Sequence, residues 1–273
     1  MLLLPLSEKV GGGAKSPVNH IVELSQALKR FQTRLIYVSL PLKLSVYPEL
    51  VAQDSTFLKG ASTLPQFRQM TLELLKNDVE VVDIFPVFMR HKKDSATHLF
   101  AKGHYISSEG ARLTAQTLAE YLQATTEFSP DNAHFKALGT TIYKNEKIYI
   151  PSQQDSPFCI FGNCNLQAFH SKGAGIASNL AFFLDKEVDY LGRKLIFFAK
   201  EFKNETFDER TFKECCKRDI AICISFLSGS FVRTSVFSMT KKQALLKFLR
   251  GKPLVNRSWS TLDLESICYN KKP

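Results

Sequence analysis

The chain has 273 residues, of which 44% are hydrophobic and 23% charged, and its formal net charge is +10. A chain of this composition buries a sizeable core, and no stretch approaches the roughly 18 consecutive apolar residues of a membrane-spanning helix, which excludes such a helix. The Lys and Arg residues lie in scattered pairs, which favours polyanions as partners without identifying one, and no RNA-binding signature accompanies them.

The first half of the chain alternates helices with strands. Hydrophobic periodicity and turn residues predict, in order, helix 21–31, strand 35–40, helix 64–77, strand 79–85 ended by Pro86, an irregular polar segment 90–108 and helix 109–123. This alternation is typical of a parallel sheet with helical crossovers.

The second half resumes the same alternation after an interruption. Residues 124–150 are polar and turn-rich, with a short alternating strand at 147–150, and we interpret them as an excursion between two halves of one domain. The pattern then predicts strand 158–161, helix 173–185, strand 194–198, strand 219–226 and helix 242–249. A single domain is therefore expected over residues 15–240, with a C-terminal extension over 241–273.

The cysteines and glycines give no indication of a cofactor. The six cysteines, at positions 159, 164, 215, 216, 223 and 268, contain no Cys-x-x-Cys pair, so neither a zinc site nor a disulfide framework is predicted. The Gly173-x-Gly175 segment lacks the third glycine and the downstream acid of a nucleotide-binding loop. We therefore predict no cofactor and no metal.

The N-terminus carries no export signal that the sequence reveals. Residues 1–6 (MLLLPL) are too short for the core of a signal peptide and have no basic leader. The expectation is that the protein is cytoplasmic or that its true N-terminus lies upstream of this chain.

The most informative local pattern is residues 156–166 (SPFCIFGNCNL), where an apolar strand runs directly into Gly-Asn-Cys. A helix is predicted shortly afterwards. Many α/β hydrolytic folds present their nucleophile on the turn that follows such a strand. The reactive atom here would be the sulfur of Cys164.

Four segments carry a resemblance to a known family: residues 37–49 (YVSLPLKLSVYPE), 81–86 (VVDIFP), 99–111 (LFAKGHYISSEGA) and 161–164 (FGNC). Together, and in this order, they resemble the SGNH hydrolase-like domain of the alginate O-acetyltransferase family. The third segment is similar to that family's Asp-x-His-Trp element and the fourth to its Gly-Asp-Ser block. In that family, unlike ordinary GDSL esterases, the histidine element precedes the nucleophile.

The chain also departs from the family pattern. Lys102 stands where the family has an aspartate two positions before the histidine, Tyr105 replaces the tryptophan, and one extra residue follows His104 before the glycine. At the nucleophile block Asn163 replaces aspartate and Cys164 replaces serine. An alternative alignment places Tyr105 at the histidine position and leaves no base.

The resemblance implies a three-layer α/β/α, flavodoxin-like SGNH hydrolase-like domain with a mostly parallel sheet. It implies O-acyl transfer, most simply acetyl transfer, to a carbohydrate or polysaccharide, or removal of that group as an esterase. The family works in the bacterial cell envelope, which contrasts with the missing export signal. The acyl donor is not indicated.

Cys164 and His104 are the candidate catalytic pair. A thiol has an ordinary pKa near 8.5, so a neighbouring imidazole or the N-terminus of a helix, such as the predicted helix 173–185, is needed to raise its thiolate fraction at neutral pH. We expect the backbone amide of Cys164 and the side chain of Asn163 or Asn179 to stabilise the oxyanion. His98 is a weaker candidate base.

Each of these residues also has a simpler interpretation. Cys164 is equally explained as a small, inert turn residue and His104 as a loop histidine. Two further polar residues are interpreted in the same way: His170, six residues after Cys164, as a helix-surface residue, and Asp83 as a cap or turn residue. The rival hypothesis is a degenerate family member that binds carbohydrate, or assists assembly, without chemistry. A third reading is a basic protein that binds polyanions.

Overall fold

The computed structural model of the protein describes residues 17–50, 65–93, 98–101, 105–132, 155–194 and 207–225. The strands are β1 (Arg34–Ser39), β2 (Glu80–Asp83), β3 (Phe158–Gly162), β4 (Asp189–Arg193) and β5 (Ile220–Ser225). The α-helices are α1 (Pro17–Lys29), α2 (Lys43–Val46), α3 (Pro65–Lys76), α4 (Phe85–His91), α5 (Ser108–Thr125), α6 (Cys164–Gln167), α7 (Ile176–Leu184) and α8 (Glu209–Cys215). Two 3₁₀ helices are η1 (Pro48–Leu50) and η2 (His170–Lys172).

The five strands form one sheet in the order β2-β1-β5-β3-β4, and every pair in it is parallel. The central strand β5 pairs with β1 from Arg34 beside Ile220 to Ser39 beside Ser225. All six of its residues are buried, which suits a parallel sheet covered on both faces. The predicted parallel sheet is thus confirmed.

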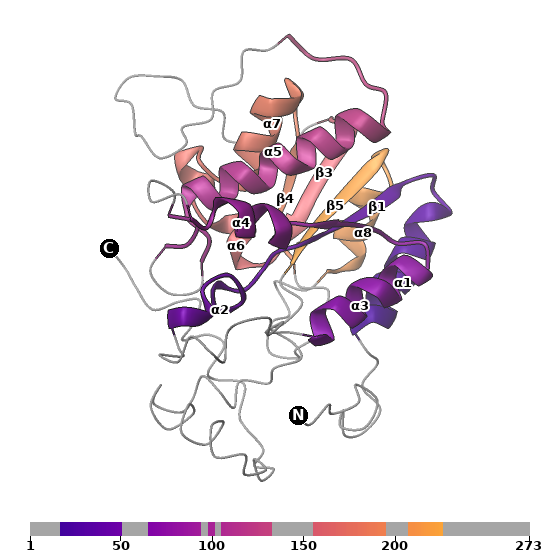
Figure 1. Ribbon diagram of the computed structural model, residues 1–273. Helices are drawn as coiled ribbons and strands as arrows, with labels where there is room; N and C mark the ends of the chain where they lie inside the picture. Colours follow the sequence, from indigo (N-terminus) through magenta and orange to yellow (C-terminus); the bar gives the residue numbers. More distant parts are fainter. Residues whose placement is uncertain are drawn as a thin grey trace.

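Helices cover both faces of this sheet (Figure 1). Successive side chains of a strand point to opposite faces, so Ile36 and Val38 join one core while Leu35 and Tyr37 join the other. The first core also takes residues from α4, α5, α6 and α7, and the second from α1, α3 and α8. This is the three-layer α/β/α architecture that the sequence predicts.

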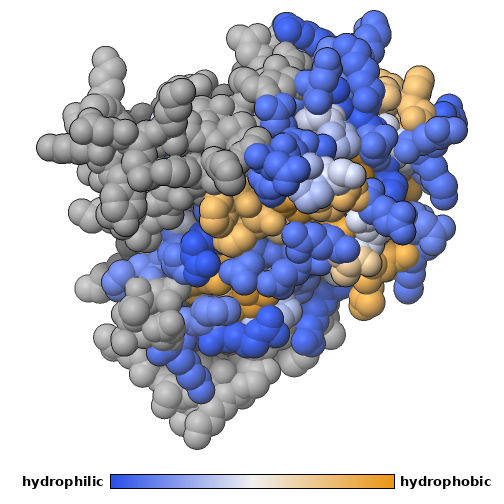
Figure 2. Space-filling view, turned by 90° about the horizontal axis from the view of Figure 1, so that it is seen from above, coloured by the Kyte–Doolittle hydropathy of each residue, from blue (hydrophilic) through white to orange (hydrophobic). Residues whose placement is uncertain are grey.

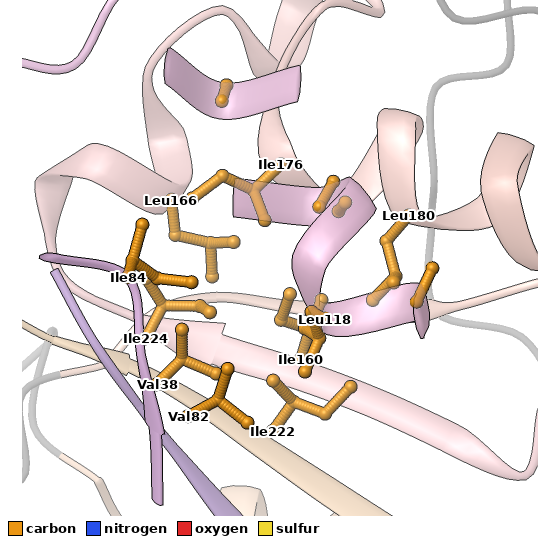
Figure 3. Close-up of a cluster of buried hydrophobic side chains, with 14 of the residues drawn as sticks. Val38, Val82, Ile84, Leu118, Ile160, Leu166, Ile176, Leu180, Ile222 and Ile224 are labelled. Atoms are coloured by element: carbon orange, nitrogen blue, oxygen red, sulfur yellow. The ribbon is translucent and has the colours of Figure 1, made fainter. Parts of the chain in front are cut away.

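Branched aliphatic residues dominate the first core. Figure 3 shows Val38, Ile160 and Ile222 of neighbouring strands beneath Leu118 of α5 and Leu180 of α7. Each of these side chains is fully buried. Complete burial of one such side chain contributes about 1.5–3 kcal/mol, so this layer fixes α5 and α7 on the sheet.

Most predicted elements appear near their expected positions, and the differences concern the end of one strand, the edge strand and several short helices. The predicted strand 79–85 ends at Asp83, because its carboxylate accepts a hydrogen bond from the backbone N–H of Phe85 (3.0 Å) and α4 starts there, with Pro86 in the first turn. The edge strand β4 was not predicted, and neither were the short helices α2, α4, α6 and α8. The predicted elements at 147–150, 195–198 and 242–249 lie outside the described residues.

The face shown in Figure 2 is mostly hydrophilic, with hydrophobic patches among the polar residues. Across the described residues the large exposed hydrophobic side chains are few: Phe31, Leu72, Leu75, Met89 and Phe182. Isolated exposures of this kind are ordinary for a globular surface.

Candidate active site at the carboxyl end of β3

The order of the strands marks one end of the sheet as the place for a site. Counted from β3 through β5 and then β1 and β2, the sheet order becomes 2-1-3-4-5, which is the flavodoxin-like order. In such sheets ligands bind beyond the carboxyl ends of the strands, where the connections diverge to either side. Here that point lies between β3 and β5, and Cys164 comes two residues after β3 ends.

Gly162 lets β3 approach β5 closely at this point. A Cβ atom on Gly162 would lie 2.2 Å from the carbonyl oxygen of Ile224, a distance that no side chain tolerates. The next residue, Asn163, donates its backbone N–H to the same carbonyl oxygen at 3.0 Å. The sequence Gly-Asn therefore holds the start of the turn against β5.

Asn163 caps the short helix α6. Its Oδ1 accepts a hydrogen bond from the backbone N–H of Asn165 (2.9 Å), and Cys164 is the first helical residue. Ala168 closes the turn by donating its N–H to the carbonyl oxygen of Cys164. The strand, the glycine and the cap together place Cys164 on a defined turn at the switch point.

Cys164 and Cys216 are the partly exposed cysteines among the described residues, whereas Cys159, Cys215 and Cys223 are buried. A hydrogen bond with the Cys159 thiol, followed by burial, raises the pKa of Cys215, and burial raises the pKa of Cys223. These buried thiols are poor nucleophiles at neutral pH. Partial burial raises the pKa of Cys216 as well, and this residue follows the end of α8, away from the turn after β3.

His104 and Lys102 lie outside the described residues, so their side chains are not placed. The chain on either side is placed. Ala101 donates its N–H to the carbonyl oxygen of Tyr105 at 3.0 Å, and Ser107 donates to that of Leu99 at 2.9 Å. Residues 102–104 therefore join two short segments that pair with each other.

The amides of Asn163 and Asn179 are in different situations. The Nδ2 of Asn163 is buried and has no hydrogen-bond partner in the described part of the chain. The Nδ2 of Asn179 donates to the carbonyl oxygen of Gly175 (2.8 Å), one turn earlier in α7. Asn163 thus has an unused donor beside Cys164, while Asn179 uses one donor within its own helix.

The structure places His98 and His170 through contacts of their own. His98 is exposed, and its carbonyl oxygen accepts a hydrogen bond from the Ser107 hydroxyl. His170 is half-buried in η2 and stacks on Tyr190 with ring centroids 3.7 Å apart, so it is not the surface residue that the sequence suggested. Burial lowers the pKa of His170 and raises that of Tyr190 to about 12, which favours the neutral form of both rings.

Asn165 is a residue of this region that the sequence did not single out. Its side chain is fully buried, and its Oδ1 accepts a hydrogen bond from the backbone N–H of Ile106 at 2.8 Å. The two residues are 59 positions apart, so no local pattern connects them. The one available signal was a second asparagine directly after Cys164.

The described residues contain neither a metal-binding cluster nor a membrane-spanning helix. Nowhere in these residues do three or more His, Cys, Asp or Glu side chains gather as a metal site would require. None of the helices that the structure describes is both long and apolar enough to cross a bilayer.

Solved structures with the same fold include three bacterial proteins. The O-acetyltransferase domain of Pseudomonas putida AlgJ has a TM-score of 0.54 at 14% identity, over 86% of this chain and 89% of its own. Pseudomonas aeruginosa AlgX has a TM-score of 0.53 at 15% identity, over 78% of this chain and 57% of its own, and Bacillus cereus PatB1 has a TM-score of 0.50 at 10% identity over 77% and 88%. At these identities the likeness establishes the fold alone.

A search of curated protein sequences found no match. A sequence model of one family does match, over residues 8–147, which is half of the chain and includes the His104 segment but not Cys164. The chain belongs to the family of the SGNH hydrolase-like domain of acetyltransferase AlgX.

Proposed function

We propose that the protein transfers an acyl group, most simply acetyl, to a hydroxyl group of a carbohydrate through a thioester on Cys164. The observation that carries this proposal is the position of Cys164. It is partly exposed, on a capped turn directly after β3, at the point where the connections of the sheet diverge. That position suits a nucleophile in a flavodoxin-like sheet.

The proposed reaction has two steps. The imidazole of His104 takes the proton of the Cys164 thiol, the thiolate attacks the carbonyl carbon of the acyl donor, and the leaving group departs with that proton to give the thioester and a neutral imidazole. The acceptor hydroxyl then attacks the thioester, its proton passes to the imidazole of His104, and the Cys164 thiolate leaves. The backbone N–H of Cys164 and the Nδ2 of Asn163 are the proposed donors to the oxyanion. With water as the acceptor, the same steps make an esterase.

A sulfur nucleophile fits the replacement of the family's aspartate by Lys102. A thiol near its ordinary pKa of about 8.5 ionises far more readily than a hydroxyl, so it depends less on a carboxylate that orients the base. The change from serine to cysteine and the loss of the acid are therefore consistent with each other.

The acceptor class rests on the family and on charge. The family is named after the acetyltransferase AlgX, and the similar domain of P. putida AlgJ is an O-acetyltransferase domain. A net charge of +10 favours an acidic acceptor such as an anionic polysaccharide. We therefore propose a polysaccharide acceptor of bacterial origin.

The test is to incubate the full-length protein with p-nitrophenyl acetate and to measure its intact mass. We expect an acetyl adduct in the wild-type protein, no adduct at this site in Cys164→Ala, and formation slowed by about 100-fold or more in His104→Ala, since general-base catalysis contributes about that much. Cys164→Ser is the matched control. A serine hydroxyl is similar in size to the thiol but far less acidic, so this variant is expected to be acylated far more slowly. An adduct unchanged in Cys164→Ala contradicts the proposal.

The second candidate function is carbohydrate binding without catalysis. Lys102, in place of the family's acid, is the observation that favours it. A protein of this kind gives no adduct but binds polysaccharide equally well with and without the Cys164 thiol. Comparing binding by wild type and Cys164→Ala therefore separates the two functions.

A further inference from the structure

The pairing of residues 99–101 with 105–107 leaves one backbone donor on its outer side. Phe100 and Ile106 form an antiparallel bridge, flanked by the hydrogen bonds from Ala101 to Tyr105 and from Ser107 to Leu99. In such a ladder the N–H of Ile106 points away from the paired segment. Ile106 is fully buried, and a buried N–H without a partner is costly.

Asn165 supplies that partner from the other half of the fold. Its Oδ1 accepts the N–H of Ile106 at 2.8 Å, and its own backbone N–H donates to Oδ1 of Asn163 at 2.9 Å. The two asparagines that flank Cys164 are thereby linked to each other and to Ile106. Ile106 is two residues after His104 in the chain.

The other contacts of this segment lead to different elements, whereas the hydrogen bond to Asn165 leads to the nucleophile turn. Phe100 packs edge-on against Phe88 of α4 and Tyr47, and the Ser107 hydroxyl caps α5 by accepting from Gly110 N–H at 3.0 Å. These contacts hold the segment to α4 and α5. Within the described residues, the hydrogen bond to Asn165 holds it to α6.

The Nδ2 of Asn165, unlike its Oδ1, makes no hydrogen bond with the described residues. It is buried and has no hydrogen-bond partner in the part of the chain that the structure describes. A buried amide donor without a partner is unfavourable, and an apolar side chain of similar size would avoid that penalty. An apolar side chain would lack the carbonyl oxygen that accepts the N–H of Ile106, so this hydrogen bond is the reason for an amide at this position.

We propose that Asn165 is a positioning residue, whose side-chain oxygen fixes the histidine-bearing segment in register with the Cys164 turn. This inference rests on the proposed function, in which His104 activates Cys164. Asn165 does not touch the reacting atoms in this scheme. It holds Ile106, two residues after His104 in the chain, against the Cys164 turn. Through His104 we expect it to lower the pKa of Cys164.

The experiment measures how fast iodoacetamide alkylates Cys164 as a function of pH, by peptide mass spectrometry. The four proteins are wild type, Asn165→Leu, His104→Ala and the double variant. We expect the Cys164 thiol of wild type to ionise below the usual 8.5, and each single variant to shift its pKa upward by about one unit, which slows alkylation about tenfold at pH 7. The rate at pH 10, where the thiol is ionised in all four, stays the same.

The double variant separates positioning from a general structural effect. If Asn165 acts through His104, Asn165→Leu adds nothing further in the His104→Ala background. Thr114→Val is the control for loss of a buried polar group, since Thr114 is fully buried and its hydroxyl donates only to the carbonyl oxygen of Gly110 in its own helix. It is expected to leave the thiol titration of wild type unchanged.

Two results would overturn the role of Asn165 while leaving the proposed function intact: a wild-type titration in Asn165→Leu, or fully additive shifts in the double variant. An ordinary thiol pKa in wild type that His104→Ala leaves unchanged would instead overturn the proposed function, and the role of Asn165 with it. Circular dichroism checks the fold of each variant, and Asn165→Ala provides the same loss of oxygen should the leucine prevent folding.

Discussion

Gly162 determines how closely the nucleophile turn lies to β5. Its α-carbon faces the carbonyl oxygen of Ile224 so closely that even a methyl group does not fit. The chain can relieve such a clash only by separating β3 from β5, and these are two interior strands on which both cores pack. Packing of the sheet and geometry of the site therefore depend on the same residue.

Gly162→Ala is expected to reduce the free energy of unfolding by about 3 kcal/mol, because overpacking here displaces backbone and not a flexible side chain. Gly192→Ala is the comparison: its φ of +83° strains an alanine, but the nearest atom to the new methyl group is 3.8 Å away. A loss of about 1–2 kcal/mol is expected there. Urea unfolding measures both, and a smaller loss for Gly162→Ala than for Gly192→Ala would contradict the argument.

At the scale of single residues, the sequence indicated Cys164 as the candidate nucleophile from its local context, since an apolar strand ending in Gly-Asn-Cys is a short-range pattern. It could not predict Asn165, whose role depends on a partner 59 residues away. The half-burial of His170 escaped prediction for the same reason, because its stacking partner Tyr190 belongs to β4, the edge strand.

Among the elements, β2 is attached to the fold partly through polar contacts. Only one of its four residues is buried. Glu80 at its start receives two hydrogen bonds from the Arg34 guanidinium of β1 (3.0 and 2.8 Å) and one from the Tyr121 hydroxyl of α5 (2.9 Å). A single carboxylate thus joins two strands and a helix.

Glu80→Gln is expected to cost about 1 kcal/mol at pH 7, a value kept low because both charged side chains are about one-third exposed. Burial alone would raise the pKa of Glu80, but the hydrogen bonds from Arg34 and Tyr121 and the Arg34 charge outweigh it and lower the pKa. The stabilisation is therefore complete above the unfolded-state pKa of about 4.3 and is lost as the pH falls through the lower folded-state pKa.

Urea unfolding of wild type and Glu80→Gln at a series of pH values checks this sign. The difference between the two proteins should be constant near neutrality and shrink below about pH 4. Glu209→Gln is the control, because this carboxylate is exposed on α8 and its pair with Lys213 is not expected to contribute measurably. A difference that grows on acidification would refute the assignment.

The elements that the sequence missed share a physical cause. Helix α8 and strand β4 are short, and their burial depends on contacts across the sheet that local periodicity does not record. Asp189, the first residue of β4, is fully buried and pairs with Arg218 at 2.6 Å, although an aspartate ordinarily argues against a strand. The long periodic helices α3 and α5 were predicted well because their pattern is local.

Over the whole molecule, the strand order explains why the motifs occur in an unusual order along the chain. The strand order is flavodoxin-like when the strands are counted from β3. The chain is therefore a circular permutation of that order, in which β1 and β2 come first in the sequence. The family's histidine element then precedes the nucleophile turn in the chain. Both nevertheless belong to the same end of the sheet, as the contact between Asn165 and Ile106 demonstrates.

The distribution of charge along the chain makes a prediction about polyanion binding. Residues 226–262 contain no Asp or Glu but several basic residues, namely Arg233, Lys241, Lys242, Lys247, Arg250, Lys252 and Arg257. On α8, by contrast, Lys213 pairs with Glu209, and the adjoining Lys217 pairs with Glu214. We therefore expect the field that attracts a polyanion to come mainly from residues 226–262.

Binding of fluorescent alginate oligosaccharide at increasing salt measures this field. The logarithm of affinity should fall linearly with the logarithm of salt concentration, and Lys241→Gln with Lys242→Gln should reduce the slope by about one unit per charge removed. Lys213→Gln with Lys217→Gln removes the same charge from side chains already paired with carboxylates, so a smaller change is expected. Equal changes in both double variants, or binding that is independent of salt, would show that residues 226–262 do not attract the polyanion.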